Sequence, residues 1–389
     1  MKSPSTPLPR KIKVAIVIPK YGLVGGAERF VAEVTERMAR EGRYEFHVFA
    51  NQWRAEEGSP VIFHKVHIIR FPRFLKPYGF PWFVQRKIAR GGFDLVHSHD
   101  RLFHADIFSL HCVPHNRWIR DVRKKRPSLY DRGVISLERS MIKNGGESTF
   151  LTVSSLAEET FSSEYEPLPG NWQIVHPCVD VARFSSPDRG ACRSDIRGKF
   201  GISASDLLVL FVGMNFELKG LDTVMEAIAR AEHDCPEKRI HLLVVGKGNE
   251  AKYRKLAGSL NIVDNVTFAG TLSVGIERFY RAADLFIMLS SFDTFGMVVL
   301  EAMAAGLPVI VSSNVGAKDL VENGVNGFIL NDAINSDSAA DLIVRLRNDE
   351  RRNQMGKAAA ETASHHDWDK LVGRMSAVYQ EVLYRKGVA

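Results

Sequence analysis

The sequence contains few cysteines, and none is placed for disulfide pairing or metal binding. The four are Cys112, Cys178, Cys192 and Cys235 in 389 residues, with no C-x-x-C pair or other metal spacing among them. This usage is typical of reduced thiols and excludes a disulfide-stapled or zinc-finger domain.

Long hydrophobic runs are also missing. No apolar stretch approaches the ~20 residues of a membrane-spanning helix. The run VAIVIP near the start is too short for the core of a signal peptide and is followed by Lys20. We therefore expect a cytoplasmic protein, with a disordered tail at residues 1–10.

The signatures of several cofactor and catalytic classes are absent. No G-x-G-x-x-G follows the first predicted strand, so a nicotinamide site is not indicated. No G-x-S-x-G occurs, so Ser-His-Asp hydrolysis has little support. Asp367 and Asp369 form a D-x-D pair, but they open a helix, where capping explains them. We expect no metal site and no cofactor.

The composition is that of an ordinary globular protein, with 45% hydrophobic and 25% charged residues. A chain of this length predicts two domains of roughly 150–200 residues. Its formal charge of +7 is divided unevenly: residues 1–150 contain 27 Lys and Arg against 14 Asp and Glu, and residues 151–389 contain 25 against 31. The first half is therefore basic enough to seek an anionic partner.

Two basic segments contribute to this excess. Residues 70–90, RFPRFLKPYGFPWFVQRKIAR, interleave cations with aromatic residues, and residues 117–127 contain six cations in eleven positions. These six are Arg117, Arg120, Arg123, Lys124, Lys125 and Arg126. Such segments suit an anionic membrane surface or a phosphorylated glycolipid. An ordinary solvated face is the alternative, and no nucleic-acid motif accompanies them.

Strands and helices alternate in two series, which predicts two doubly wound parallel sheets of the α/β class. The expected strands are continuous Val, Ile and Leu runs, as strands buried on both faces should be. They cover residues 13–19, 45–50, 66–71, 94–99, 107–111, 149–155 and 172–177, then 206–213, 240–248, 266–270, 284–290, 307–313 and 327–330. We expect domains at 11–185 and 206–366, a linker at 186–205, and a helix at 367–389 that packs back on the first domain.

The apolar segment SSFDTFGMVVLEAMAAGLPVIVSS, residues 290–313, contains two carboxylates eight positions apart, Asp293 and Glu301. The pattern predicts a loop with Asp293, a helix with Glu301, a stop at Gly306 and a strand from Pro308. The backbone N–H groups at the helix N-terminus favour an anion such as phosphate. A capping Asp and a partly exposed Glu are the alternative reading.

Glycine-rich turns follow the first strand of each half. Gly22, Gly25 and Gly26 follow the first strand, where glycines allow backbone to approach a ligand closely. In the second half, Gly213 ends the strand and Lys219 precedes the next helix, where a lysine can neutralise a phosphate. A plain tight turn and a solvated lysine are the alternatives.

Taken together, these motifs resemble the retaining glycosyltransferases of family 4, which have the GT-B fold. The likeness covers nearly the whole chain. It is most specific over residues 206–330, which contain VGMNFELKG, VVGKG, SFDTFGMVVLEAMAAGLPVI and NGVNGFIL in order. Within the family, the chain is most similar to the lipopolysaccharide core glucosyltransferases that act on heptose. The resemblance implies two Rossmann-like domains that face a central cleft.

The resemblance also implies roles for particular residues. Asp293 would face the donor sugar and Glu301 the ribose of the nucleotide, with Lys219 neutralising the diphosphate. The other residues implied in donor binding are Gly25, Gly26, Gly213, Phe295, Gly296, Met297 and Val298. Asp293 stands where the family usually has Glu, and Met214 stands where many members have Arg, so one phosphate contact is missing or comes from elsewhere.

Many family members place a histidine at the end of a first-domain strand, facing the donor sugar. His111 fits that position and is the implied catalytic histidine; His115, four residues on, is the alternative. His97 and His99 end another strand. A structural role for a histidine remains equally open.

The resemblance therefore implies a metal-independent transferase that moves a hexose, best guessed as glucose from UDP-glucose, to a saccharide or glycolipid acceptor. Lipopolysaccharide core or other cell-surface glycan synthesis would be its setting, at the inner face of the cell membrane. A nucleotide-sugar epimerase of the same fold and a non-catalytic glycolipid-binding protein are the alternatives.

Overall fold

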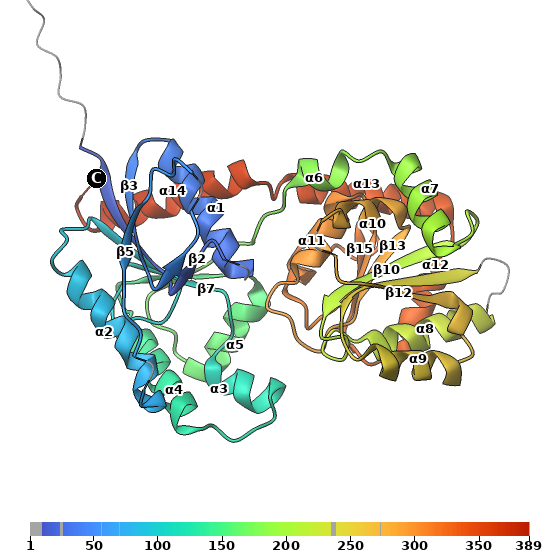
Figure 1. Cartoon of the computed structure of the whole chain (residues 1–389), viewed down its shortest axis with the longest axis horizontal. Helices are drawn as coiled ribbons and strands as arrows, with labels where there is room; N and C mark the ends of the chain where they lie inside the picture. The colour runs from blue at the N-terminus through green and yellow to red at the C-terminus, as the bar shows by residue number, and fades with distance from the viewer. Residues whose placement is uncertain are drawn as a thin grey trace, which may run out of the picture. The chain divides into compact units, whose positions relative to one another are not determined.

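The computed structural model describes residues 10–23, 26–55, 57–69, 71–234, 239–272 and 274–388. The tail expected at residues 1–10 lies outside these ranges except for Arg10. The chain forms two compact units (Figure 1). Unit 1 comprises Met1–Val153, Ala157–Val175 and Leu371–Ala389, and unit 2 comprises Ser154–Leu156 and His176–Lys370.

The division between the units differs from the expected one. Residues 186–205 are not a linker, because Arg189–Phe200 form helix α7 within unit 2. The side chain of Asp188 accepts a hydrogen bond from the Ala191 amide and so caps this helix, and Gly201 ends it in the left-handed conformation with φ +66°. In the stretch SSPDRG (residues 185–190), which resembles a linker in composition, Asp188 is therefore a helix cap and Gly190 lies in the first turn of α7.

Unit 1 contains a seven-stranded sheet in the order β5-β3-β1-β6-β7-β8-β9, and every pairing is parallel. The strands are β1 (Ile12–Val17), β3 (Tyr44–Ala50), β5 (Ile62–Lys65), β6 (Leu95–Ser98), β7 (Ile107–Leu110), β8 (Thr149–Thr152) and β9 (Asn171–Ile174). The strand order reverses between β1 and β6. A separate two-stranded ladder joins β2 (Lys20–Tyr21) and β4 (Gln52–Trp53).

The strand expected at 66–71 was wrong, since the edge strand β5 lies just before it. An edge strand has one paired neighbour, and β5, with the sequence IFHK, is accordingly partly exposed. Val66 and Ile68 instead pack in the core cluster with Phe80 and Val84 of helix α2 (Lys76–Ile88). The continuous apolar run therefore marks helix contacts and not a strand.

Helices cover both faces of the unit 1 sheet (Figure 1). On one face lie α2, α4 (Leu129–Lys143) and α5 (Ser155–Tyr165). On the other lie α1 (Gly26–Arg40) and the C-terminal helix α14 (Trp368–Arg385). Tyr379 of α14 is fully buried against Tyr44, with ring centroids 5.5 Å apart.

Unit 2 contains a six-stranded parallel sheet in the order β12-β11-β10-β13-β14-β15. The strands are β10 (Leu207–Met214), β11 (Ile240–Lys247), β12 (Val266–Gly270), β13 (Leu285–Met288), β14 (Val309–Ser312) and β15 (Gly327–Leu330). One face packs on α8 (Leu221–Asp234), α9 (Glu250–Ser259) and α12 (Ser336–Arg345). The strand order reverses between β10 and β13. Two doubly wound sheets are therefore confirmed.

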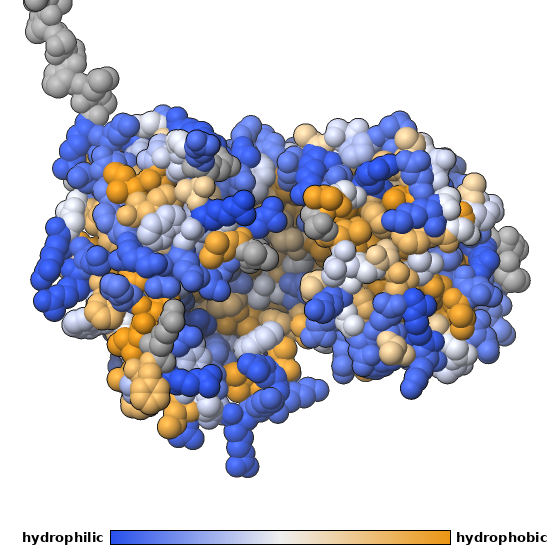
Figure 2. All heavy atoms as spheres, viewed as in Figure 1, coloured by the Kyte–Doolittle hydropathy of each residue, from blue (hydrophilic) through white to orange (hydrophobic). Residues whose placement is uncertain are grey.

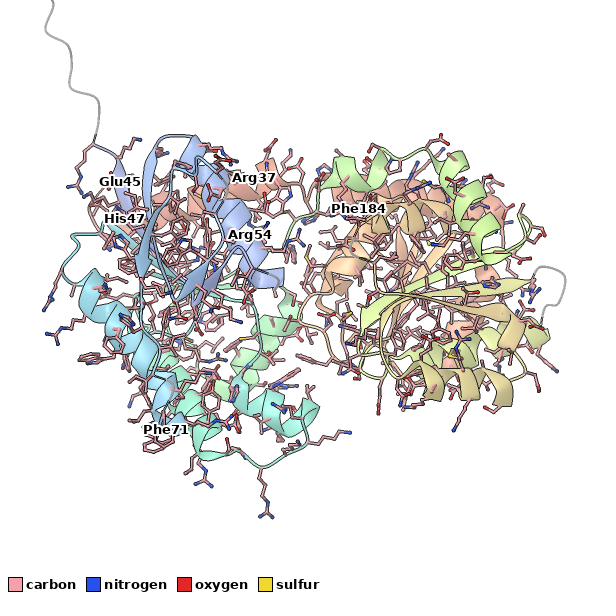
Figure 3. The ribbon with its side chains drawn as sticks, viewed as in Figure 1. Arg37, Glu45, His47, Arg54, Phe71 and Phe184 are labelled. Carbon is pink, nitrogen blue, oxygen red and sulfur yellow. The ribbon has the colours of Figure 1, made fainter. Side chains whose placement is uncertain are left out.

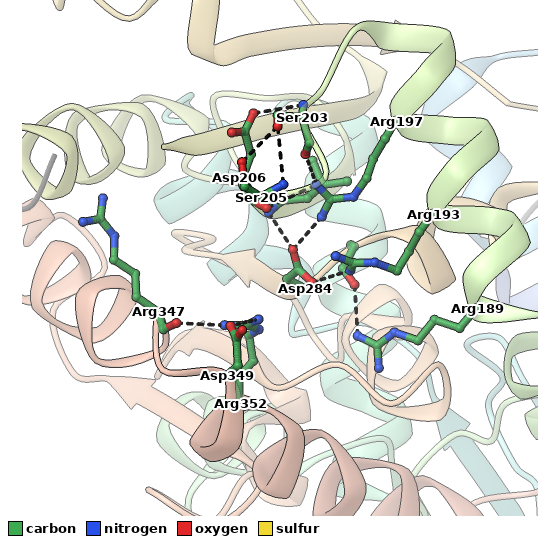
Figure 4. Close-up of polar contacts among 12 residues, drawn as sticks. Arg189, Arg193, Arg197, Ser203, Ser205, Asp206, Asp284, Arg347, Asp349 and Arg352 are labelled. Atoms are coloured by element: carbon green, nitrogen blue, oxygen red, sulfur yellow. Dashed lines mark hydrogen bonds and ion pairs between the residues drawn. The ribbon is translucent and has the colours of Figure 1, made fainter. Parts of the chain in front are cut away.

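A buried ion cluster ties α7 to the sheet of unit 2 (Figure 4). Asp284, 3% exposed, accepts hydrogen bonds from Arg193 at 2.5 Å, Arg197 at 2.7 Å and the Leu208 amide at 2.9 Å. Burial opposes ionisation of this carboxyl, but the amide and the two guanidinium groups outweigh it and hold the pKa of Asp284 below its usual value. Arg197 is itself buried, so each charge of this pair depends on the other.

Removing the carboxylate should therefore destabilise unit 2 strongly. We expect Asp284→Asn to lower the free energy of unfolding by about 3–5 kcal/mol, because it leaves Arg197 charged and buried without its partner. Asp195→Asn, which breaks the exposed pair with Arg278, should cost less than about 1 kcal/mol. Urea unfolding of the full chain measures both.

The pH dependence of this difference has a defined sign. The folded-state pKa of Asp284 is lowered, so its stabilisation is present above the unfolded-state pKa and is lost as the pH falls through the folded-state pKa. The difference in the free energy of unfolding between wild type and Asp284→Asn should therefore become smaller in acid. Equal stability of the two proteins at neutral pH would contradict the role given to this cluster.

Candidate functional site

A lysine and an aspartate meet where the strand order of unit 2 reverses. Lys219 follows β10 and Asp293 follows β13, and these strands are neighbours in the sheet but not consecutive in sequence. The Lys219 ammonium forms an ion pair with Oδ2 of Asp293, and both side chains are less than one-fifth exposed. Ligands of open α/β sheets bind at this kind of position.

The backbone fixes the position of Asp293. Its amide donates to the Asn314 carbonyl at 2.9 Å, and its own carbonyl accepts from the Gly316 amide at 3.0 Å. Its Oδ1 accepts from the Phe295 amide at 3.2 Å. The loop after β13 is thus bonded to the loop after β14, and the carboxylate is held with Oδ2 toward Lys219.

Glycine at 213 leaves room for the lysine. A Cβ on Gly213 would lie 3.0 Å from Cγ and 3.4 Å from Cβ of Lys219. Gly220, directly after the lysine, has φ +73°, and a Cβ there would lie 2.1 Å from the Leu289 carbonyl oxygen. Larger residues would displace Lys219 from the strand end.

Helix α11 (Met297–Ala304) begins directly after this loop. Gly296 is its N-terminal flanking residue and has φ +88°, and a Cβ there would come within 3 Å of Val315 and Met288. Met297 is 37% exposed, whereas Phe295 is 4% exposed and packs in the core. Met297 and Val298 at the start of α11 are therefore accessible, whereas Gly296 and the Phe295 side chain are buried.

Glu301 lies one turn further along α11 and has a buried partner. The Tyr280 hydroxyl on α10 (Ile276–Ala282) donates to Oε2 of Glu301 at 2.7 Å. Burial, with Glu301 adding to it, raises the pKa of Tyr280 well above its ordinary value, so Tyr280 remains a donor. The sequence analysis missed Tyr280, because in FYRAADLF it reads as one more apolar helix residue.

A second residue missed from the sequence is Lys247. Met214, which stands where many family members have Arg, is 58% exposed at the end of β10. Lys247 ends the neighbouring strand β11 directly opposite Met214 and is exposed. Parallel strands lie about 4.8 Å apart, so a cation stands beside the position where the expected arginine is missing.

Three histidines cluster at the carboxyl ends of β6 and β7 in unit 1. His111 follows β7, and its Nε2 lies 3.0 Å from Nδ1 of His99, with the two rings stacked. His97 contacts the hydroxyls of Ser109 and Tyr379, each at 2.8 Å. Burial lowers the pKa of His111 to about 4 and that of His97 to about 3. The cluster is therefore neutral at pH 7.

Three other predicted site residues belong to the first domain: His115, Gly25 and Gly26. His115 pairs with Asp131, with Nε2 and Oδ1 2.9 Å apart. Gly25 lies outside the described residues, and Gly26 is described only as the first residue of α1. His111 fits the strand-end position better than His115.

The six cations of residues 117–127 divide into two sets. Arg117 and Arg120 both pair with Asp121, at 3.3 and 2.7 Å. The other four, Arg123 to Arg126, are exposed, and in the part of the chain that the structure describes no acidic partner is found for them. The last set therefore supplies the uncompensated charge.

Exposed apolar side chains accompany these cations. Phe71 is 86% exposed, Leu129 69% and Trp82 51%. Figure 3 shows Phe71 at the periphery of unit 1, far from Glu45 and His47 of β3. Around α2 and α4, hydrophobic side chains lie beside hydrophilic ones on the face shown in Figure 2.

Neither a metal-binding cluster nor a membrane-spanning helix is found among the described residues. No group of three or more His, Cys, Asp or Glu side chains is arranged to hold a metal ion there. None of the helices in those ranges combines the length and apolarity that crossing a bilayer requires.

Comparison with known proteins decides the family. The model described as Glycosyltransferase Family 4 matches residues 24–183, and the model described as Glycosyl transferases group 1 matches residues 193–362. Together they account for most of the chain. The chain belongs to glycosyltransferase family 4. The resemblance stated from the sequence is thereby confirmed.

Several curated relatives of this glycosyltransferase are D-inositol 3-phosphate glycosyltransferases. That of Geodermatophilus obscurus is 32% identical over 238 residues, which are 58% of this chain and 51% of the relative. That of Corynebacterium aurimucosum is 24% identical over 94% of this chain and 93% of its own. The chain thus spans about half the length of the curated relatives that it matches at 30% identity or more.

Solved structures support the fold. WaaG, a glycosyltransferase of lipopolysaccharide biosynthesis, has a TM-score of 0.74 at 22% identity, covering 94% of this chain and 99% of WaaG. Anabaena HepE in complex with UDP has a TM-score of 0.72 at 16% identity, covering 95% of this chain and all of HepE. The GT-B fold is therefore confirmed.

The histidine cluster of this glycosyltransferase gives a prediction about protonation. His111 should titrate with a pKa of about 4, because burial disfavours its charged form. Since the unfolded chain binds this proton more readily, stability should fall as the pH drops from about 6.5 toward 4. NMR titration of the imidazole signals measures the pKa, with His111→Gln as the assignment control. A midpoint near 6.5 for His111 would contradict the neutral cluster.

Proposed function

We propose that the protein is a retaining glycosyltransferase that moves a hexose from a nucleotide sugar to a saccharide or glycolipid acceptor. UDP-glucose is the first donor to test. Lipopolysaccharide core or another cell-surface glycan is the proposed setting. The likeness to WaaG and the inositol-phosphate acceptor in the names of the curated relatives support this class of reaction.

The observation that carries the proposal is the arrangement around the N-terminus of α11. Lys219 pairs with Asp293 in the loop that leads into α11, and Gly296, Met297 and Val298 lie at the N-terminus of that helix. An ammonium and a helix N-terminus together favour a diphosphate, and they would stabilise the charge that develops on a leaving nucleoside diphosphate. No metal ion is needed for that role.

Asp293 and Glu301 would then orient the donor. Glu301, positioned by Tyr280, would accept hydrogen bonds from the ribose hydroxyls. Asp293, which pairs with Lys219, would do the same for the sugar. Lys247 would supply the second phosphate contact in place of the family arginine.

The proton of the acceptor hydroxyl needs a base. His111 is a poor permanent acceptor, because one nitrogen faces His99 and burial disfavours the imidazolium. We propose that the donor phosphate itself takes the proton, as the family resemblance implies, and that His111 provides a neutral hydrogen bond to the donor sugar. Retention of configuration would follow from attack on the same face as the departing diphosphate.

A donor screen tests this function. In the presence of EDTA, one member of a panel of nucleotide sugars should bind and be hydrolysed or transferred. Glu301→Ala should weaken donor binding, and Asp293→Ala should chiefly lower turnover, each by roughly thirty- to a thousandfold for a lost charged contact of ~2–4 kcal/mol. Lys219→Ala should impair both. Asp293→Glu restores the usual family residue and should retain substantial activity.

The outcomes of the screen separate the alternatives. Conversion of one nucleotide sugar into another without an acceptor would identify an epimerase, and binding without turnover would identify a glycolipid-binding protein. Loss of all activity in EDTA that manganese or magnesium restores would contradict the metal-free account. Full activity of folded Glu301→Ala and Asp293→Ala would overturn the site.

We also propose that the protein binds an anionic membrane surface through Arg123, Lys124, Lys125 and Arg126. These cations are exposed on unit 1, as are Phe71, Trp82 and Leu129. Each basic residue near such a surface contributes about 1 kcal/mol, and screening limits the field to ~10 Å at 0.1 M salt. Binding should therefore be salt-sensitive.

Co-sedimentation with liposomes tests this surface. Changing the four residues to Gln should remove ~4 kcal/mol and abolish binding to anionic vesicles, while nucleotide-sugar binding in unit 2 remains. A matched control changes four exposed cations of unit 2, Lys252, Arg254, Lys255 and Arg278, to Gln and should retain vesicle binding. Equal binding to neutral and anionic vesicles, or equal loss in both variants, would show an ordinary solvated face.

A further inference from the structure

A pocket of about 320 Å³ lies where the strand order of unit 1 reverses. Its walls come from the segments after β1, β3, β5 and β6 and from helices α2 and α4. Carboxyl ends of parallel strands at a reversal form the usual ligand crevice of an open sheet. All the residues that line this pocket belong to unit 1, so it is distinct from the Lys219–Asp293 site of unit 2.

The pocket is lined by both apolar and charged side chains. The apolar ones are Ile68, Pro77, Phe80, Pro81, Val134 and Leu137. Three cations and one carboxylate line it as well: Lys20, Lys76, Arg101 and Asp100. A compound with C–H faces, hydroxyls and a negative group would match both kinds of side chain.

The two lysines carry the uncompensated charge. Arg101 is bound to the buried carboxylate of Glu138, with contacts of 2.6 and 2.7 Å, and His115 pairs with Asp131. Lys20 is exposed, and Lys76 lies over the Tyr130 ring at 6.0 Å. Within the described residues, no carboxylate pairs with either lysine, so both ammonium groups are available to an anion.

Asp100 supplies an acceptor next to them. Its Oδ1 accepts from the Arg101 amide at 2.8 Å, and for its other oxygen the described residues provide no donor. Burial raises the pKa of Asp100. A hydroxyl of a ligand in the pocket could donate a hydrogen bond to this second oxygen.

We propose that this pocket binds a phosphate ester of a polyhydroxylated acceptor, with Lys20 and Lys76 on the phosphate and Asp100 on a hydroxyl. Phosphate is favoured over a neutral sugar because two unpaired ammonium groups line one small pocket, and lysine binds phosphate as a point charge. The assignment of this compound as the acceptor rests on the proposed function. The phosphate site itself does not.

Lysine-specific NMR on the full chain tests the anion site. Reductive ¹³C-methylation keeps the lysine charge, and Lys20→Arg and Lys76→Arg assign the two signals by removing them. Titration with inorganic phosphate against chloride at equal ionic strength should shift both signals with one dissociation constant. Lys143, exposed at the far end of α4, should not respond.

Variants give the size of the effect. Lys20→Gln should raise the phosphate dissociation constant reported by Lys76 about tenfold, as expected for one lost charge-assisted contact. Lys143→Gln should leave this dissociation constant unchanged. Lys20→Arg, which keeps the charge, should retain most of the wild-type affinity for phosphate. Shifts of Lys143 in step with Lys20 and Lys76, or no response of these two, would overturn the site.

A second titration tests the hydroxyl. Glucose 6-phosphate should bind the wild type at least about tenfold more tightly than inorganic phosphate, and Asp100→Asn should remove this advantage. Inorganic phosphate should bind Asp100→Asn no more weakly, because a nearby negative charge has been removed. An advantage that persists in Asp100→Asn would refute the role of Asp100.

UDP-glucose titration of the same samples separates the two proposals. Donor binding without a phosphate response at Lys20 and Lys76 would reject the pocket and leave the transferase function standing. A phosphate response with no binding of any nucleotide sugar would reject the transferase function and leave the pocket standing.

Discussion

Both candidate sites depend on one constraint, the single reversal of strand order in each parallel sheet. At a reversal, two neighbouring strands send their following loops in opposite directions, so nothing covers the space between their carboxyl ends. In unit 2 this places Lys219 after β10 beside Asp293 after β13. In unit 1 it places Lys20 after β1 and Asp100 after β6 in one pocket.

The two units thus repeat one arrangement, a lysine after the first strand and an aspartate across the reversal. The outcomes differ because of the packing around each pair. In unit 2, Gly213 and Gly220 let Lys219 lie against the sheet, where it reaches Asp293 directly. In unit 1, Lys20 is exposed and the Asp100 carboxylate is held by the Arg101 amide, so the charges stay separate. The first arrangement suits a diphosphate, and the second suits a ligand that brings both an anion and a hydroxyl.

Much of the fold could be predicted from the sequence because its strands are buried on both faces. The expected ranges include twelve of the thirteen sheet strands, most of which are largely apolar. The strand that was missed, β5, lies at an edge and is partly exposed, while the apolar run after it packs on α2. The linker prediction failed for a related reason: SSPDRG contains residues that break one helix and cap the next, and local composition does not distinguish that from a connector.

The candidate site was only partly predictable. The sequence predicts Asp293, Glu301 and Lys219 because each lies close to a recognisable strand end or helix start. It does not predict Tyr280 and Lys247, because their relevance comes from a contact across helices and a register between strands. The pocket of unit 1 is harder still, since Lys20, Lys76 and Asp100 come from three separated segments and each alone reads as a surface charge.

The charge of the first half shows why such pairing has to be known before a charge is assigned a role. Its excess of basic residues is not spread evenly over unit 1. Arg101, Arg117 and Arg120 are neutralised by nearby carboxylates. Other cations for which the described residues provide no ion pair, such as Arg73, Lys87 and Arg132, are spread over unit 1. The run from Arg123 to Arg126 is the densest group of such cations, and Lys20 and Lys76 share one pocket. A field screened over ~10 Å acts locally, so the proposed membrane contact and the proposed phosphate pocket are two separate features. The exposed run can respond to any anionic surface, whereas the pocket admits only an anion small enough to enter it.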